Sequence, residues 1–162
     1  MKFSIIIPTY NRQEQLDECL RAIRGLDYPR DQHEVVVIAD GGETVAAPGV
    51  RLVRQVPRGG PGRARNLGAA QASGQYLVFT DDDCRPRKDW LRTIEARLAA
   101  DPEAMVGGAI RNAATENRYS TATQVIIDFL YQGVLRYKQS CRAGARLPGI
   151  GGIRFELADS GW

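Results

Sequence analysis

The sequence has few histidine and cysteine side chains. It contains one histidine, and its three cysteines, Cys19, Cys84 and Cys141, lie far apart with no Cys-x-x-Cys pair among them. This spacing suggests neither a disulfide framework nor a thiolate zinc site. An odd number of separated cysteines favours a reducing compartment, so we expect a cytoplasmic protein.

A long hydrophobic run is also missing. The N-terminal "MKFSIIIPTY" has one lysine and a short apolar stretch, whereas a signal peptide needs a longer apolar region and a cleavage site. A membrane-spanning helix needs about 20 apolar residues, and the sequence has no such segment. We therefore predict a soluble chain, and contact with the inner face of a membrane stays open.

Neither sign of charge is in large excess. The 22 basic and 19 acidic residues give a net charge of +3, which is too small to predict a nucleic-acid partner. Hydrophobic residues make up 43% of the chain and charged residues 25%, which is ordinary for a globular protein. The 162 residues contain no internal repeat and suffice for one domain over residues 1–162.

Short apolar runs alternate with segments of helical periodicity. The apolar runs predict strands at residues 2–7, 33–40, 50–56, 75–80 and 104–112. The periodic segments predict helices at residues 16–26, 63–73, 88–100 and 119–137, with Asn11 as an N-cap and Gly74 as a left-handed C-terminal stop. This order predicts an α/β fold, a mostly parallel sheet flanked by helices on both faces.

Polar side chains follow three of the predicted strands. Residues 9–12 read Thr-Tyr-Asn-Arg, residues 40–42 read Asp-Gly-Gly, and residues 81–83 are three aspartates. The carboxyl ends of parallel strands lie at one edge of the sheet, where open α/β sheets bind their ligands. We therefore expect these residues to share one site.

The acidic triplet predicts a metal site. Alternate residues of an extended chain point to the same side, so Asp81 and Asp83 can converge while Asp82 points away. Two carboxylates suit Mg²⁺ or Mn²⁺, which complete their coordination with water and substrate phosphates. A solvated loop with its acids near Lys88 at the start of the next helix is the alternative.

The segment "PRGGPGRARN" predicts an anion site. Arg63 and Arg65 lie at the start of a predicted helix behind a glycine-rich stretch, where free N–H groups can bind phosphate. A flexible loop with surface arginines is the alternative. Tyr10 could present its aromatic ring to a ligand or simply pack against the protein. Asp40 could contact a nucleobase or ribose, or form an Asx-turn. Together these signals indicate a metal-bound diphosphate beside a nucleoside.

The order of these motifs resembles that of a known family. The segments "FSIIIPTYNR", "EVVVIADGG", "GGPGRARNLGAAQASGQYLVFTDDDC" and "GGIRFELADSGW" are similar to family 2 glycosyltransferases, which have the Rossmann-like GT-A fold. The resemblance covers nearly the whole chain. It implies transfer of a sugar, with inversion, from a nucleoside diphosphate sugar to a carbohydrate, lipid-linked or other hydroxyl acceptor, with Mg²⁺ or Mn²⁺.

The resemblance also implies roles for individual residues. Residues 1–112 would bind the donor, and residues 113–162 would be an incomplete acceptor side. The metal ligands would be Asp83 and Asp81. The donor-binding residues would be Pro8, Thr9, Tyr10, Arg12, Asp40, Gly41, Gly59, Arg63, Arg65, Asn66, Asp81 and Asp82.

Two departures from the family pattern leave alternatives open. Family members often have two acids before the glycines of the second motif, and here the contact to the base falls either to Asp40 or to a position taken by Ala39. Members also continue past "RFELADSGW" into an acidic pair that holds the general base, and this chain ends before it. General-base catalysis contributes about 10²–10⁴-fold to rate.

The expectation is therefore a chain truncated before its catalytic base. A catalytically silent module that binds a nucleotide or nucleotide sugar is the first alternative. A nucleotidyltransferase is the second, although it needs a glycine-rich arginine loop after the first strand, and "PTYNR" is not one. The basic loop at residues 140–152 is interpreted as solvated, with an acceptor or an anionic lipid surface as other possible contacts.

Overall fold

The computed structural model describes residues 1–45, 47–113, 116–126 and 128. The chain divides into two compact units, Met1–Ala96 and Arg97–Trp162, and the first contains the sheet. The elements are β1 (Phe3–Thr9), α1 (Gln13–Arg24), a 3₁₀ turn η1 (Arg30–Gln32), β2 (His33–Asp40), β3 (Arg51–Gln55), α2 (Gly60–Gln71), β4 (Tyr76–Phe79) and α3 (Trp90–Ala100).

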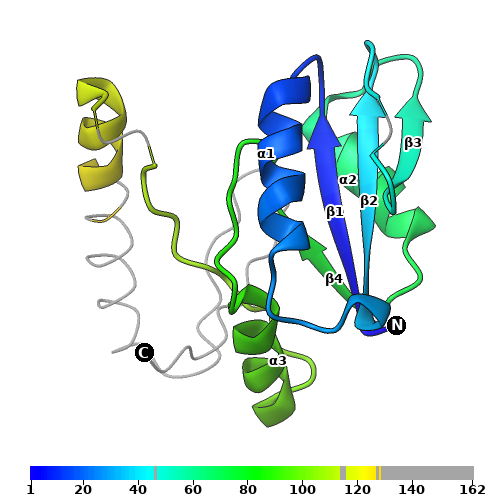
Figure 1. The fold of residues 1–162 in the computed structure, drawn as a ribbon, viewed down its shortest axis with the longest axis vertical. Coiled ribbons are helices and arrows are strands. Elements are labelled where there is room, and N and C mark those ends of the chain that lie inside the picture. The colour runs from blue at the N-terminus through cyan, green and yellow to red at the C-terminus, as the bar shows by residue number, and fades with distance from the viewer. Residues whose placement is uncertain (46, 114–115, 127, 129–162) are drawn as a thin grey trace, which may run out of the picture. The chain divides into compact units, whose positions relative to one another are not determined.

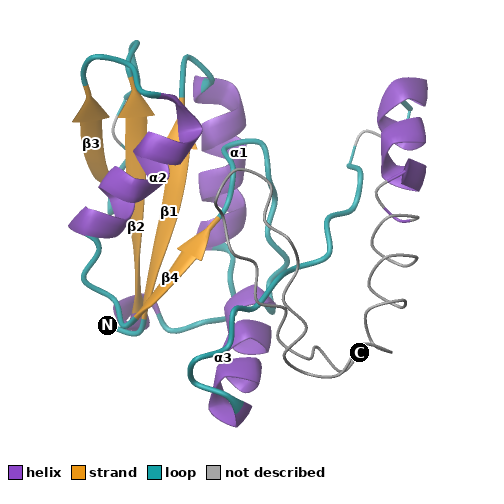
Figure 2. Cartoon of the chain, turned by 180° about the vertical axis from the view of Figure 1, so that it is seen from behind, coloured by secondary structure: helices purple, strands orange, loops and turns teal. Residues whose placement is uncertain are grey.

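The four strands form one parallel sheet in the order β3-β2-β1-β4. In its register Thr9 lies opposite Ala39, and Asp40 lies opposite Gln55, so β1, β2 and β3 end side by side. Helix α1 covers one face of the sheet and α2 the other, as the two opposite views show (Figures 1 and 2). The predicted α/β class, with helices on both faces, is confirmed.

The central strand β1 is buried along its whole length because both of its faces are covered. On one face Ile6 packs with Val36, Ile38 and Ala64 of α2 in a core cluster. On the α1 side, the buried residues recur at helical spacing: Leu16, Cys19, Leu20 and Ile23. These apolar layers make the sheet a rigid base for the loops that follow each strand.

Helix α2 approaches the sheet closely at Gly68. A Cβ atom added there would lie 2.4 Å from Cγ2 of Ile6, whereas one added at Gly62 would meet nothing within 4 Å. We expect Gly68→Val to lower the free energy of unfolding by about 1–3 kcal/mol, because added atoms would overpack the core. The matched change Gly62→Val should stay within about 0.5 kcal/mol of wild type in urea titrations. Equal effects at the two sites would contradict this packing argument.

Several boundary predictions were wrong. Residues 104–112 form no strand. The N-cap of α1 is Arg12 rather than Asn11, and it makes no side-chain capping bond. Helix α2 begins at Gly60, where Pro61 suits a first turn, and it ends before Ala72, so Gly74 is not its stop. A Cβ at Gly74 would instead lie 2.7 Å from the backbone of Phe3, so the absence of a side chain lets this loop pass close to β1.

In the second unit, residues 118–126 and 128 are helical, as the prediction for 119–137 expected over that stretch. The rest of that helix, the basic loop at 140–152 and the segment "GGIRFELADSGW" lie outside the described residues. No helix in the described part of the chain has the length and hydropathy needed to cross a membrane.

Candidate functional site

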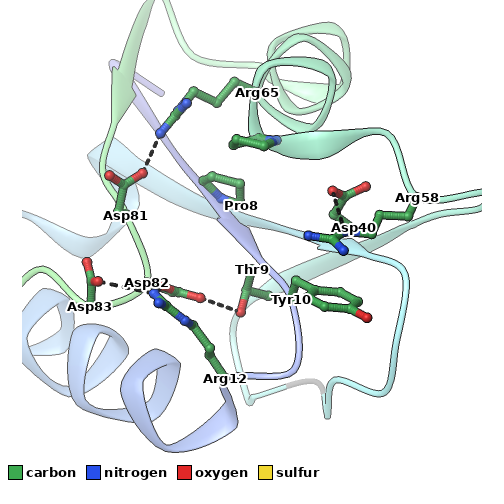
Figure 3. Close-up of a pocket in the computed structure, with 11 residues that line it drawn as sticks. Pro8, Thr9, Tyr10, Arg12, Asp40, Arg58, Arg65, Asp81, Asp82 and Asp83 are labelled. Atoms are coloured by element: carbon green, nitrogen blue, oxygen red, sulfur yellow. Dashed lines mark hydrogen bonds and ion pairs between the residues drawn. The ribbon is translucent and has the colours of Figure 1, made fainter.

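A cleft of about 440 Å³ opens at the carboxyl edge of the sheet, within the size range of small-molecule sites. Figure 3 shows its lining side chains, which come from the ends of β1 and β2, from the start of α2 and its preceding loop, and from the acidic triplet. They are Pro8, Thr9, Tyr10, Arg12, Asp40, Arg58, Pro61, Arg65, Asp81, Asp82 and Asp83.

The loop after β1 is held against the loop after β2. The side-chain oxygen of Asn11 accepts a hydrogen bond from the backbone N–H of Glu43 at 3.3 Å. Asn11 and Gly42 both have positive φ angles, 51° and 72°, and a Cβ at Gly42 would lie 1.9 Å from Oδ1 of Asn11. Only glycine fits there, and the contact fixes the turn that presents Tyr10 to the cleft.

Asp82 is the buried member of the acidic triplet, with 4% of its surface exposed. The Thr9 hydroxyl donates to it at 2.8 Å, and the Arg12 guanidinium donates at 3.2 Å. The prediction that Asp82 points away from the site was wrong, because strand β4 ends at Phe79 and the triplet does not continue it. Residues 82–83 form a turn, closed by the N–H of Cys84 donating to the carbonyl of Asp81 at 3.2 Å.

Asp81 and Asp83 face the cleft and pair with arginines. Arg65 donates to Asp81, and Arg12 donates to Asp83 at 3.1 Å as well as to Asp82 (Figure 3). The pKa of Arg12 is raised, first by its hydrogen bond to Asp82 and then by the charges of both carboxylates. Both carboxylates nevertheless remain accessible, because 55% of the Asp81 side chain and 56% of the Asp83 side chain is exposed.

These two exposed carboxylates fit a hard divalent cation. The described residues contain no cluster of three or more histidine, cysteine or acidic side chains that could hold a metal by themselves. Mg²⁺ commonly takes one or two carboxylates and completes its coordination with water and substrate phosphates. Asp81 and Asp83 could therefore hold such a cation only together with other ligands, such as water and a substrate phosphate.

Asp40 lies in the cleft wall with 3% of its surface exposed, and its oxygens are already occupied. The backbone N–H groups of Gly59 and Gly60 each donate to it at 2.7 Å, and the Gln55 amide donates as well. Burial alone would raise the pKa of Asp40, but these donors and the nearby charge of Arg58 lower it below its usual value. Asp40 therefore anchors the loop between β3 and α2.

Sequence reasoning missed Arg58, whose guanidinium lies 3.9 Å from the centre of the Tyr10 ring. Its position three residues after β3 was the available signal, since β3 ends at the same edge as β1 and β2. Pro61 was also missed. Four residues predicted to bind the donor are not among those that line the cleft, namely Gly41, Gly59, Arg63 and Asn66.

The comparisons with known proteins agree with this geometry. The family model described as Glycosyl transferase family 2 matches residues 4–161. Glycosyltransferase AglE of Haloferax volcanii is 31% identical over 117 residues, which cover 66% of this chain and 38% of AglE.

Two solved structures share the fold. One is TarS 1–349 of S. aureus in complex with UDP-GlcNAc, with a TM-score of 0.57, 25% identity, and coverage of 72% of this chain and 39% of that one. The other is the mannosyltransferase PcManGT of Pyrobaculum calidifontis in complex with GDP-Man and Mn²⁺, with a TM-score of 0.58, 29% identity, and coverage of 68% and 36%. The chain spans less than half the length of each of these relatives.

Proposed function

Since the chain belongs to glycosyl transferase family 2, with a GT-A fold, we propose that its cleft binds a nucleoside diphosphate sugar and serves sugar transfer to an acceptor hydroxyl. The observation that carries this proposal is the division of the cleft into two chemically different ends. One end holds Asp81, Asp82 and Asp83 with Arg12 and Arg65, and the other holds Tyr10 with Arg58.

The acidic end suits the diphosphate together with a divalent cation. Asp81 and Asp83 would hold Mg²⁺ or Mn²⁺, which would neutralise the charge that develops on the departing nucleoside diphosphate. Arg12 and Arg65 supply forked donors beside the same carboxylates and can bind phosphate oxygens bidentately. The bound Mn²⁺ and GDP-Man of the mannosyltransferase neighbour support this assignment.

Transfer with inversion requires the acceptor hydroxyl to attack the anomeric carbon from the side opposite the diphosphate. A base must take the proton of that hydroxyl. The cleft aspartates all have other partners: Asp40 and Asp82 accept internal hydrogen bonds, and Asp81 and Asp83 pair with arginines. We therefore assign them to donor binding rather than to proton abstraction.

The same observation supports a second candidate, a module that binds a nucleotide or nucleotide sugar without transferring the sugar. A single-turnover assay with a radiolabelled nucleotide sugar separates the two functions. Release of free sugar, or its transfer to an added acceptor, supports the transferase. Stoichiometric binding that leaves the donor intact through repeated incubations supports the silent module.

Donor binding itself can be tested by thermal shift with UDP, GDP, CDP and ADP, each with and without Mn²⁺. We expect one or two of these nucleotides to raise the unfolding temperature only when Mn²⁺ is present. A ligand at 100 times its dissociation constant stabilises the folded state by about 2.7 kcal/mol, which is well within reach of the method. No shift with any nucleotide would overturn the donor-site assignment.

A further inference from the structure

Arg12 joins two carboxylates of the acidic triplet through a single nitrogen atom. Its Nη1 donates to Oδ1 of Asp82 at 3.2 Å and to Oδ2 of Asp83 at 3.1 Å (Figure 3). The Asp83 side chain is 56% exposed, whereas the Asp82 side chain is only 6% exposed. The same guanidinium therefore pairs with one buried carboxylate and with one that faces the cleft.

The buried Asp82 fixes the position of Arg12. Its other oxygen, Oδ2, accepts a hydrogen bond from the Thr9 hydroxyl at 2.8 Å, so this carboxylate is held by residues at the end of β1 and just before α1. Removing the partner of a buried charge is far more costly than removing the partner of an exposed one, so we expect Arg12 to keep Asp82 in every state of the cleft. The contact between Arg12 and Asp83 then needs little further ordering of the arginine side chain.

Arg12 places a positive charge beside the carboxylate that is assigned to the divalent cation. The guanidinium contacts one of the two oxygens of Asp83, so a cation can still reach this carboxylate, but it does so against a like charge. An exposed ion pair of this kind contributes up to about a factor of five to an equilibrium constant. Arg12 should therefore weaken the binding of a bare cation to the empty cleft by a factor of that size.

A diphosphate in the cleft would change this balance. Arginine binds phosphate oxygens through paired N–H donors, and the Arg12 side chain lines the cleft with 53% of its surface exposed. A diphosphate that accepts hydrogen bonds from Arg12 would draw the guanidinium from Asp83 while Asp82 keeps its own contact. Because coupling between two ligands is reciprocal, the cation would raise the affinity for the diphosphate by the same factor.

We propose that Arg12 is a positioning residue that occupies Asp83 in the empty cleft and releases it when a diphosphate binds. This inference rests on the proposed donor-binding function. It assigns part of the coupling between cation and nucleotide to Arg12, in addition to the part that comes from the direct bond between the cation and the phosphates.

The first test measures the binding of Mn²⁺ alone, from the electron paramagnetic resonance signal of the free ion. We expect the dissociation constant of Arg12→Met to be lower than that of the wild type by about fivefold or more, because Asp83 has lost its internal cation. The Arg12 side chain makes no capping bond to α1, so the helix should be unaffected.

Arg85→Met is the matched control for charge. Arg85 lies two residues after Asp83, is 58% exposed, and pairs with Glu18 of α1 instead of a triplet carboxylate. Its replacement removes the same charge from the same part of the chain and should leave Mn²⁺ binding close to that of the wild type. An equal gain in affinity for Arg85→Met and Arg12→Met would overturn the proposal.

A double variant, Arg12→Met with Asp82→Asn, keeps the net charge of the acidic end unchanged. It frees Asp83 without leaving a buried carboxylate unpaired, since asparagine can still accept from Thr9. We expect it to bind Mn²⁺ more tightly than the wild type, by up to about fivefold. Affinity equal to that of the wild type would mean that net charge alone acts, and weaker binding would make Asp82 a ligand of the cation. Either result contradicts the proposal.

The second test measures dissociation constants of UDP, GDP, CDP and ADP by calorimetry, each with Mn²⁺ and with EDTA. The ratio of the two constants is the coupling factor between cation and nucleotide. In Arg12→Met this factor should fall by about fivefold and stay above one, because the direct bond remains. An unchanged factor would overturn the role of Arg12 and leave the donor site standing. If the wild type binds none of the four, the donor site fails, and the coupling fails with it.

Discussion

Asp83→Asn is expected to weaken binding of the preferred nucleoside diphosphate in the presence of Mn²⁺ by about 100-fold or more. Loss of even an outer-shell partner commonly costs about 10–100-fold in metal affinity, and Asp83 is assigned as a direct ligand. The substitution keeps the size of the side chain and removes only its charge. Asp82 stays bonded to Arg12 and Thr9, so the turn should keep its shape.

The same variant should behave in the opposite way when metal is removed with EDTA. Without a cation, Asp83 adds a negative charge to a cleft that must accept a diphosphate, and like charges disfavour each other's ionised state. Asp83→Asn should then bind the nucleotide as tightly as the wild type or more tightly. Weaker binding with Mn²⁺ together with equal or tighter binding in EDTA would not arise if Asp83 served only to support the fold.

Asp89→Asn provides the matched control. Asp89 is similarly exposed, at 52%, and pairs with Arg87, but it does not line the cleft. Its neutralisation should leave nucleotide binding unchanged with and without Mn²⁺. Equal losses for Asp83→Asn in Mn²⁺ and in EDTA would contradict the metal assignment, and equal losses for Asp89→Asn would show that the binding responds to net charge alone.

The sheet and its binding edge could be predicted because they depend on strong, local patterns. The β-branched runs before Pro8 and Asp40 are too short and too apolar for anything but buried strands. Parallel pairing then brings their ends together without any knowledge of side-chain contacts. This is why Thr9, Asp40 and the triplet were expected in one place, and the cleft contains all of them.

Predictions that depended on the path of the chain after a strand were less successful. The alternation rule assigned Asp82 to the wrong side because it assumed an extended chain where a turn occurs. For Asp40, a contact to a base or ribose and an Asx-turn were both open, and nothing in the sequence indicated that Gly59 and Gly60 donate to its carboxylate. Such bonds join the end of β2 to the start of α2, far apart in the sequence, and hydrophobic periodicity carries no information about them.

Gly74 is a second residue whose role depends on a contact that is distant in the sequence. A glycine after a helix is commonly the left-handed stop, and local sequence alone supported that interpretation. In the structure its N–H donates to the Ser4 hydroxyl at 2.8 Å, and its missing side chain lets the backbone pass β1. A structural role for a glycine at this position was predicted, but that role depends on a contact with β1, a strand that is distant in the sequence.

Asp40→Asn is expected to lower the free energy of unfolding at neutral pH by about 2–4 kcal/mol. The carboxylate accepts hydrogen bonds from two backbone N–H groups and one side-chain amide. A hydrogen bond to a charged group contributes about 1.5–3 kcal/mol to stability. An asparagine has one acceptor oxygen, so its amide group would face at least one of these donors. Urea titrations at pH 7 measure this loss.

The effect should depend on pH with a definite sign. Because the folded protein lowers the pKa of Asp40, the extra stability is fully present above the ordinary carboxyl value of about 4. It is lost as the pH falls through the lower, folded-state value. The difference in stability between the wild type and Asp40→Asn should therefore be largest at neutral pH and shrink in acid. Taking this difference removes the contributions of Glu34 and Glu95, whose pKa values are also lowered.

The exposed Asp31 supplies the control, and Asp31→Asn should leave both the stability and its pH dependence close to those of the wild type. If Asp40→Asn were as stable as the wild type at pH 7 but failed to bind nucleotide, Asp40 would be a ligand contact rather than a loop anchor. A destabilised variant that still binds nucleotide supports the anchoring role, in which Asp40 holds the loop between β3 and α2.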